Sequence, residues 1–139
     1  MRNKLPILFA ALALAVASLA CSVLGGGEPS LSNVRTAYDS DGENTSSTFG
    51  SFDTVYVVTD LENGVSGNVV SSNWYGENVD GFDPDSFIDV VEYTVVDETF
   101  TGTVHFYFEA PSSGWPLGTY RVEVFFNGAP AGTVRFTIQ

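Results

Sequence analysis

The sequence is poor in cysteine, histidine and positive charge. Its 139 residues include one cysteine and one histidine, and five Lys and Arg residues against seventeen Asp and Glu. One cysteine cannot form an intramolecular disulfide framework or a cysteine-rich zinc site. So few basic residues exclude the clustered Lys and Arg that bind nucleic acid, and we expect no nucleic-acid partner. A hydrophobic content of 44% nevertheless indicates a folded protein rather than a disordered acidic tail.

Only the N-terminus carries a long apolar run. It extends from Leu5 to Ala20 and follows two basic residues, Arg2 and Lys4. The run is shorter than the roughly 20 residues that a membrane-spanning helix needs. A basic start, an apolar run and small residues in that order are typical of a secretory signal peptide. We therefore predict that residues 1–20 are a cleaved signal, whose removal leaves three arginines and no lysine.

The single cysteine lies directly after the predicted signal. Cys21 follows Ser18-Leu19-Ala20, and a Gly- and Ser-rich segment comes after it. This arrangement resembles the signal peptide and lipobox of bacterial lipoproteins. The resemblance implies cleavage before Cys21, a thioether-linked diacylglycerol on its sulfur, and a place on the extracytoplasmic face of a cell-envelope membrane. An ordinary cleavable signal that happens to end at a cysteine is the alternative.

After the signal, the sequence predicts a tether and one domain. Residues 21–30 are rich in Gly and Ser and predict a flexible tether. Residues 31–139 alternate between apolar and polar side chains, and no helical stripe is present. The predicted strands lie at approximately residues 31–38, 54–61, 67–75, 87–96, 100–108, 119–126 and 132–138. Seven short strands separated by turns indicate an all-β fold, an antiparallel β-sandwich.

Several turn signals separate these strands. We predict turns at Asp39–Glu43 and Glu62–Gly64, a long loop at Gly76–Ser86 and a tight connection at Asp97-Glu98. Asn127-Gly128 is the strongest hairpin signal in the chain, because both residues accept the positive φ angles of a tight hairpin turn.

Two aromatic positions carry a second resemblance. Trp74 lies on the third predicted strand, and Trp115 to Val124 contains the pattern proline, x, glycine, x, tyrosine, x, valine. These features resemble immunoglobulin-like and fibronectin-type-III-like domains, including uncharacterised domains on bacterial lipoproteins. The resemblance implies that Trp74 belongs to the core and that Tyr120 pins a corner between strands. The cysteine pair of antibody domains is absent.

The sequence offers little for catalysis. His105 alternates with Thr103 and Tyr107 on the polar face of a predicted strand, and nothing places a nucleophile and an orienting acid beside it. No glycine-rich phosphate loop opens a helix. We therefore expect no enzymatic activity and no cofactor beyond the covalent lipid.

Two acidic clusters are candidates for binding Ca²⁺, which takes six to eight oxygen ligands. The candidate ligands are Asp39, Asp41 and Glu43 in the first cluster, and Asp80, Asp83 and Asp85 in the second. The first cluster fails the full calcium-loop pattern, because its sixth position holds Asn44 instead of glycine. The alternative is that these loop carboxylates are simply solvated.

Tyr75 and Trp115 are candidate binding residues, since Trp and Tyr often anchor interfaces. Trp115 could instead be a packing plug beside Pro116. The favoured hypothesis is a lipid-anchored, non-catalytic binding or spacer module, with the loop at residues 76–86 as the first candidate surface. Its partner would be an envelope protein or a glycan. The alternatives are a structural subunit that pairs through an edge strand, and a calcium-dependent adhesion or carbohydrate-binding module.

Overall fold

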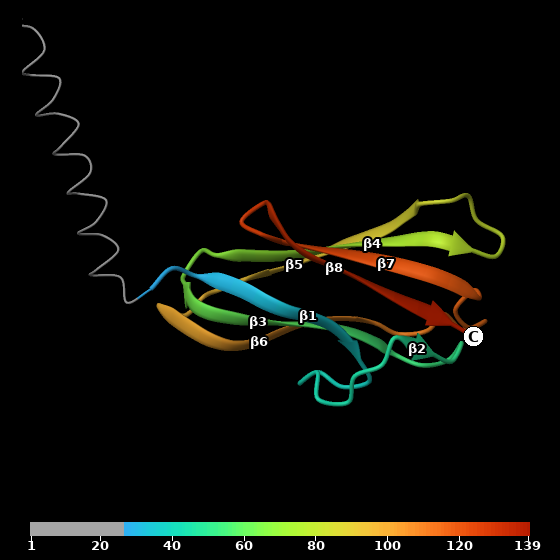
Figure 1. Cartoon of the computed structure of the whole chain (residues 1–139), viewed down its shortest axis with the longest axis horizontal. Helices are drawn as coiled ribbons and strands as arrows, with labels where there is room; N and C mark the ends of the chain where they lie inside the picture. The colour runs from blue at the N-terminus through green and yellow to red at the C-terminus, as the bar shows by residue number, and fades with distance from the viewer. Residues whose placement is uncertain (1–26) are drawn as a thin grey trace, which may run out of the picture.

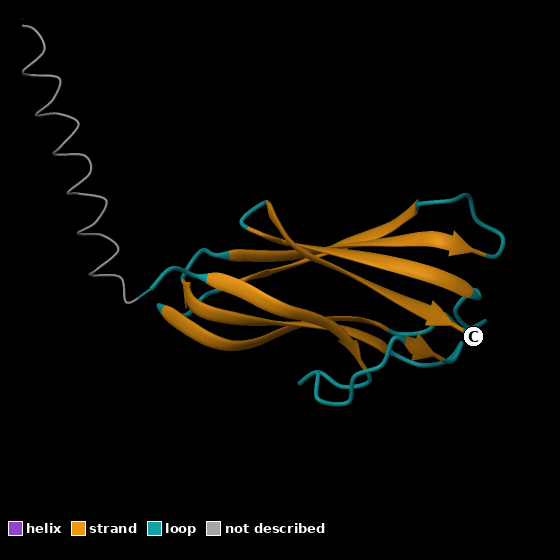
Figure 2. Ribbon diagram, in the orientation of Figure 1, coloured by secondary structure: helices purple, strands orange, loops and turns teal. Residues whose placement is uncertain are grey.

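The computed structural model describes residues 27–139, so the predicted signal peptide, Cys21 and most of the predicted tether lie outside it. The described residues form eight strands and no helix, so none could cross a membrane as a helix (Figure 2). The strands are β1 (Ser30–Ala37), β2 (Thr48–Phe49), β3 (Val55–Val65), β4 (Val69–Val79), β5 (Ser86–Thr94), β6 (Thr99–Phe108), β7 (Gly118–Phe126) and β8 (Ala129–Ile138).

The strands form two sheets that pack face to face (Figure 1). The first sheet has the order β1-β3-β6, and the second has the order β2-β8-β7-β4-β5. Every pairing is antiparallel except that of β2 with β8. The prediction of an all-β sandwich is therefore confirmed.

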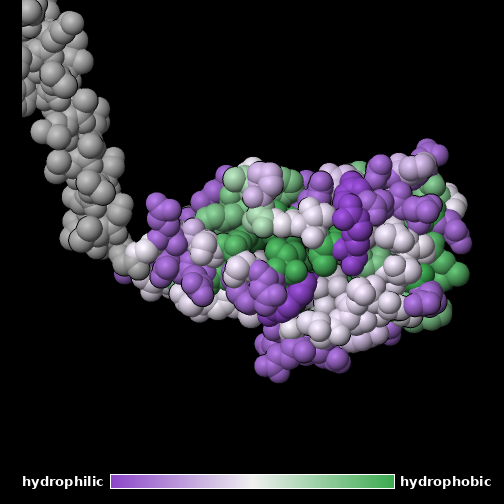
Figure 3. Space-filling model, in the orientation of Figure 1, coloured by the Kyte–Doolittle hydropathy of each residue, from purple (hydrophilic) through white to green (hydrophobic). Residues whose placement is uncertain are grey.

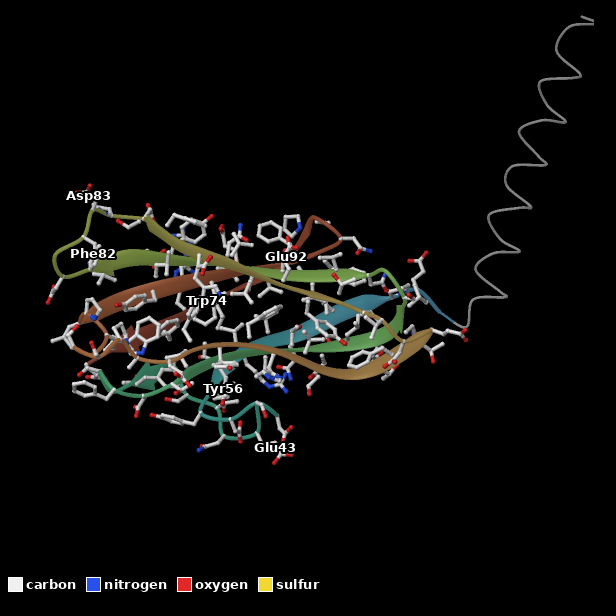
Figure 4. All side chains as sticks on the ribbon, turned by 180° about the vertical axis from the view of Figure 1, so that it is seen from behind. Glu43, Tyr56, Trp74, Phe82, Asp83 and Glu92 are labelled. Atoms are coloured by element: carbon white, nitrogen blue, oxygen red, sulfur yellow. The ribbon has the colours of Figure 1, made fainter. Side chains whose placement is uncertain are left out.

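The core lies between the sheets and is built from the alternation seen in the sequence. On β4, the alternating residues Val70, Ser72 and Trp74 lie on one side of the strand and are fully buried. The Trp74 ring meets the ring of Phe108 edge-on at 4.7 Å, and its Nε1 donates a hydrogen bond of 2.9 Å to Ser72 Oγ (Figure 4). This bond satisfies the only polar atom of the largest core side chain, so Trp74 packs in the core without a desolvation penalty.

The predicted tyrosine corner is also confirmed. Tyr120 Oη donates a hydrogen bond of 2.6 Å to the carbonyl of Pro116, and the Tyr120 ring stacks on Phe136 at 5.0 Å. Gly118, at the start of β7, has φ of +144° and lies so close to the Asn78 carbonyl that a Cβ would collide with it. Glycine is therefore required where β7 meets the end of β4.

One predicted turn is wrong. The chain does not turn at Glu62–Gly64, because β3 continues to Val65 and the turn follows at Gly67. The register between β3 and β6 shifts between Leu61 and Gly64, so Glu62 and Asn63 form a bulge within a continuous strand. The turn-forming residues Glu62 and Asn63 therefore lie in a bulge, where the positive φ of Asn63 is tolerated.

The predicted long loop is shorter than expected, and one strand was missed. β4 continues past Gly76 to Val79 through a second bulge, so the loop between β4 and β5 comprises only residues 80–85.

The polar stretch before Val55 contains the short strand β2, which the alternation pattern did not predict. β2 pairs with the C-terminal strand and buries Phe49 in the core.

Candidate functional site

The two ends of the sandwich are built differently (Figure 1). At the end where the described chain begins, the strands are joined by short connections at residues 66–68, 95–98 and 127–128. We call this the turn end. The opposite end carries the loop at residues 80–85 and the connection at residues 109–117, and we call it the pocket end.

An apolar pocket of about 270 Å³ opens at the pocket end. Its lining from β4, β5 and their loop comprises Gly76, Val79, Phe82, Ser86, Phe87 and Ile88. Its lining from the β6–β7 connection and β7 comprises Pro111, Trp115, Pro116 and Tyr120. Two segments far apart in the sequence therefore make the pocket, which only the folded chain brings together.

An irregularity at the start of β5 shapes the rim of this pocket. Asp89 pairs with Trp74 but Phe87 pairs with Tyr75, so Ile88 is an extra residue that the partner strand does not match. A bulge of this kind re-aims the neighbouring side chains. Phe87 and Ile88 on β5 remain 60% and 41% exposed, and Phe82 in the preceding loop is 58% exposed. Figure 3 shows hydrophobic residues, in green, at this right-hand end of the molecule.

Trp115 forms a rigid wall between the pocket and the core. It is only 7% exposed, its Nε1 donates a hydrogen bond of 2.9 Å to the Asp53 carbonyl, and its ring meets Tyr120 edge-on at 5.4 Å. The packing role considered for Trp115 is therefore present. The same side chain also faces the pocket, so a bound group would rest on a wall that cannot move away.

The polar atoms around the pocket already have partners. The Tyr120 hydroxyl donates to Pro116, and the Ser86 hydroxyl donates to the Asp83 carbonyl. Burial raises the pKa of Tyr120 to about 12, so its hydroxyl is neutral at physiological pH. The arrangement can hold an apolar group, and its lining offers no paired acid and base for proton transfer.

Tyr75 lies outside the pocket, on the outer face of β4. The guanidinium carbon of Arg121 lies 4.6 Å from the centre of the Tyr75 ring, and the Phe87 ring meets it at 5.8 Å. Because Phe87 also lines the pocket, Tyr75 supports the pocket rim from outside. The two predicted binding residues, Tyr75 and Trp115, therefore flank the same rim without forming one surface.

Ion pairs brace the outer face beside this rim. Arg121 donates to Asp85 at 2.7 Å and to Glu77 at 3.1 Å, and Arg135 donates to Glu77 at 2.9 Å. The hydrogen bond from Arg135, assisted by Arg121, holds the pKa of Glu77 below its usual value. The third arginine, Arg35, is paired with an aspartate on β3 at 3.1 Å. Every arginine in the described part of the chain is thus engaged with a carboxylate.

The first predicted calcium cluster is organised by hydrogen bonds within its own loop. The Asp39 carboxylate accepts from the backbone N–H groups of Glu43 at 3.0 Å and Asn44 at 3.2 Å. Arg35 donates to the carbonyls of Gly42 and Asp41. The Asp39 carboxylate therefore shapes a turn, to which Asp41 and Glu43 contribute backbone groups.

The second predicted cluster lies at the pocket end. Asp85 is paired with Arg121, whereas Asp80 and Asp83 form no ion pair with the described residues. Within residues 27–139, no three His, Asp or Glu side chains are placed to hold one metal ion. These acids therefore contribute negative charge beside the pocket.

His105 is a surface residue of β6, as the alternation predicts. Its ring lies 6.0 Å from Tyr56 and 6.4 Å from Tyr107, on the outer face of the three-stranded sheet. The pocket lining does not include it.

No protein-family model and no curated protein matches the sequence. The fold resembles part of an alkylpurine DNA glycosylase from Pseudomonas fluorescens, solved with DNA containing an abasic site analog, with a TM-score of 0.51, 12% identity, 81% of this chain and 30% of that chain covered. A β-glucosidase from Erythrobacter marinus matches with a TM-score of 0.50 and 13% identity, and the match covers 81% of this chain and 15% of that chain. A β-glucosidase from Listeria innocua, solved with glucose, matches with a TM-score of 0.48 and 10% identity, and the match covers 80% of this chain and 16% of that chain. The chain thus spans under a third of each protein, and at these identities the first two likenesses concern the fold alone.

Sequence analysis missed the exposed rim residues Phe82, Phe87 and Ile88. Two signals could have indicated them. Phe82 is a large apolar residue in the middle of an acidic loop, and Phe87-Ile88 places two apolar residues side by side where strict alternation expects one. Adjacent apolar residues at a strand start are consistent with a bulge that turns both toward one end.

Proposed function

We propose that this protein is a lipid-anchored, non-catalytic module of the cell envelope with an immunoglobulin-like sandwich that presents a binding end to the surroundings. The strand order supports the immunoglobulin-like assignment, because β1-β3-β6 faces β8-β7-β4-β5. A buried tryptophan on β4 and a tyrosine corner at the start of β7 are further features of such sandwiches.

The observation that carries the proposal is the position of the pocket. It opens at the end of the sandwich opposite to Ser30, where the first strand begins. A lipid on Cys21 would be joined to this strand by a tether that reaches at most about 30 Å when extended. The sandwich itself is roughly 37 Å long, as judged from the eleven residues of β4, so the pocket end lies farther from the anchor than the turn end by about that length. The pocket would therefore face away from the membrane, where a partner can reach it.

The geometry supports binding over catalysis. The pocket lining is almost wholly apolar, its two hydroxyl groups are engaged, and the one histidine of the chain lies on a different surface. An apolar pocket rimmed by exposed aromatic side chains is the usual anatomy of an interface anchor site.

Pairing through the β5 edge is less well supported. β5 is one edge of the five-stranded sheet, but it carries a bulge at Ile88 and the exposed acids Asp89 and Glu92, the second of which is labelled in Figure 4. Bulges and charged side chains are the devices by which edge strands avoid pairing with other strands. We therefore place the binding function at the pocket end.

The anchor is tested by the intact mass of the processed protein beside a Cys21→Ala variant. We expect a mature chain that begins at Cys21, carries a diacylglyceryl group and sediments with membranes, and a variant that lacks the lipid. A processed wild-type protein with a free thiol, or one cleaved elsewhere, would contradict the anchor.

The orientation is tested by energy transfer. A donor dye is attached in turn to Phe82→Cys and Val96→Cys, one at each end of the sandwich, on protein bound to vesicles that contain an acceptor lipid. The lipidated Cys21 sulfur does not react with the dye. We expect less transfer from residue 82 than from residue 96. Equal or reversed transfer would show that the pocket end does not face away from the membrane.

A further inference from the structure

We infer that the pocket takes one large apolar side chain from a positively charged segment of a partner protein. This inference rests on the proposed function to the extent that the pocket end is open to a partner outside the membrane. It names the chemistry of that partner, which neither the sequence patterns nor the comparisons assign.

The apolar half of the inference follows from the size and lining of the pocket. Its volume of about 270 Å³ lies just below the range of pockets for drug-sized molecules, and it suits a single side chain. Trp115 gives it a fixed wall, while Phe82 and Phe87 stand exposed at its rim. An inserted aromatic or branched aliphatic side chain would cover these exposed rings, which water now contacts.

The charged half follows from the acids around the pocket. Asp80 and Asp83 lie on either side of Phe82 in the sequence of the same loop and form no ion pair with described residues. Figure 4 shows Asp83 beside Phe82 at this end. The three arginines of the described chain are all engaged with carboxylates, so no positive charge is free to offset these acids. A segment with Lys or Arg beside its apolar residue therefore complements the pocket end and is steered toward it.

The same charges disfavour two other occupants of the apolar surface. A second copy of this chain would bring Asp80 and Asp83 against their own counterparts, because a two-fold interface joins identical patches. An anionic lipid surface would be repelled in the same way. A cationic protein segment satisfies both the apolar rim and the acids.

The first experiment uses a defined probe. It is a capped peptide with one central phenylalanine and two lysines on each side, titrated by calorimetry into the processed full-length protein in phosphatidylcholine nanodiscs. Replacing the peptide phenylalanine by alanine should weaken binding about tenfold or more. Phe82→Ala should weaken it by a similar factor. Phe52→Ala is the matched control, since Phe52 is 72% exposed but does not line the pocket, and it should leave the affinity unchanged.

The second experiment tests the charges. Replacing Asp80 and Asp83 together by asparagine should weaken binding several-fold and flatten its dependence on salt. The matched control replaces Asp97 by asparagine and Glu98 by glutamine at the turn end, and should have no effect. A peptide with glutamates in place of lysines should bind far more weakly than the lysine peptide.

Several outcomes would overturn the inference. These are equal binding of the phenylalanine and alanine peptides, unchanged binding by Phe82→Ala, equal binding of the lysine and glutamate peptides, or a dimer in sedimentation that Phe82→Ala dissociates. Both peptide comparisons use the unaltered protein, so they do not depend on the folding of a variant. If the anchor test fails, the soluble processed protein is titrated without nanodiscs, so the two failures remain distinguishable.

Discussion

The turn end and the pocket end of the sandwich close the same two sheets by different means. At the turn end, Asn127-Gly128 joins β7 to β8 directly, and both residues adopt positive φ values, 49° and 83°. At the pocket end, the connection between β6 and β7 runs over residues 109–117 and packs Trp115 against the core. Local backbone preference forms the β7–β8 connection, whereas a buried aromatic side chain fixes the β6–β7 connection.

This difference bears on the pocket beside the β6–β7 connection. A tight hairpin turn needs no side chain over the core and leaves no space between its strands. A long connection must bury side chains to offset the entropy of ordering it, and imperfect closure between two such segments leaves a hollow. Truncating the buried Trp115 should therefore cost more stability than changing an exposed residue at the turn end, and only changes at the pocket end should alter binding.

The largest effect is expected from Trp115→Ala. It removes a buried ring and its hydrogen bond to Asp53, so we expect the free energy of unfolding to fall by about 3–5 kcal/mol. Val96→Ala at the turn end, where Val96 is 78% exposed, should change it by less than about 0.5 kcal/mol. Chemical denaturation measures both. Similar costs at the two ends would break the comparison.

Tyr120 should make the pocket end sensitive to alkali. Its pKa is raised to about 12 by burial, against about 10 in the unfolded chain. The contribution of the neutral Tyr120 hydroxyl to the free energy of unfolding is therefore fully present below pH 10 and is lost as the pH rises through 12. The loss amounts to about 2–3 kcal/mol. Tyr120→Phe should abolish this part of the alkaline destabilisation, whereas Tyr107→Phe, which alters an exposed tyrosine, should retain it. Denaturation midpoints from pH 8 to 12 provide the measurement.

Two glycines, one at each end of the sandwich, should lose the same amount of stability when replaced by alanine but differ in their effect on binding. Gly81 and Gly128 both have positive φ, 84° and 83°, and neither has an atom near the position of a Cβ. Alanine at either site should cost about 1 kcal/mol of stability, because only the backbone strain differs from glycine. Only Gly81→Ala should also weaken peptide binding, since it distorts the loop that holds Phe82. A change in binding by Gly128→Ala would argue against a site at the pocket end.

The smallest effect is expected from Glu77→Gln on the outer face. It removes the carboxylate that pairs with Arg135 and one of those that pair with Arg121, and we expect a loss of about 0.5–1 kcal/mol near pH 7. Because the pKa of Glu77 is lowered in the folded protein, its contribution is present above about pH 4.3 and is lost as the pH falls through the lowered value. The variant and the wild type should therefore converge in acid. Glu92→Gln, which breaks no ion pair, serves as the control.

Most of the fold could be predicted because its signals are local. Alternation located the seven longer strands, and it identified the inward face of β4 from Val70 to Trp74. Asn127-Gly128 marked a hairpin because few other residues adopt its φ values. The strand β2 escaped prediction because two residues cannot show a period, and it exists only because β8 pairs with it.

The candidate site could be predicted only in part. The segment at residues 76–86 and Trp115 were both proposed from the sequence, and both contribute to the pocket. Their proximity was not predictable, and neither was the exposure of Phe82, Phe87 and Ile88. The bulge at Ile88 arises from the pairing of β5 with β4, and the bulge that extends β4 toward the loop of Phe82 arises from its pairing with β7; both depend on residues distant in the sequence.

The sequence by itself determined the β class and the excess of negative charge, and its resemblance to immunoglobulin-like domains implied the core position of Trp74 and the corner at Tyr120. The first two depend on alternation and composition alone. Only the tertiary structure decided that three arginines would all be engaged with carboxylates, and that a pocket would open where β4 and β5 meet the β6–β7 connection. Register and packing set these features, because a pocket is the space that distant segments fail to fill once their backbone hydrogen bonds are made.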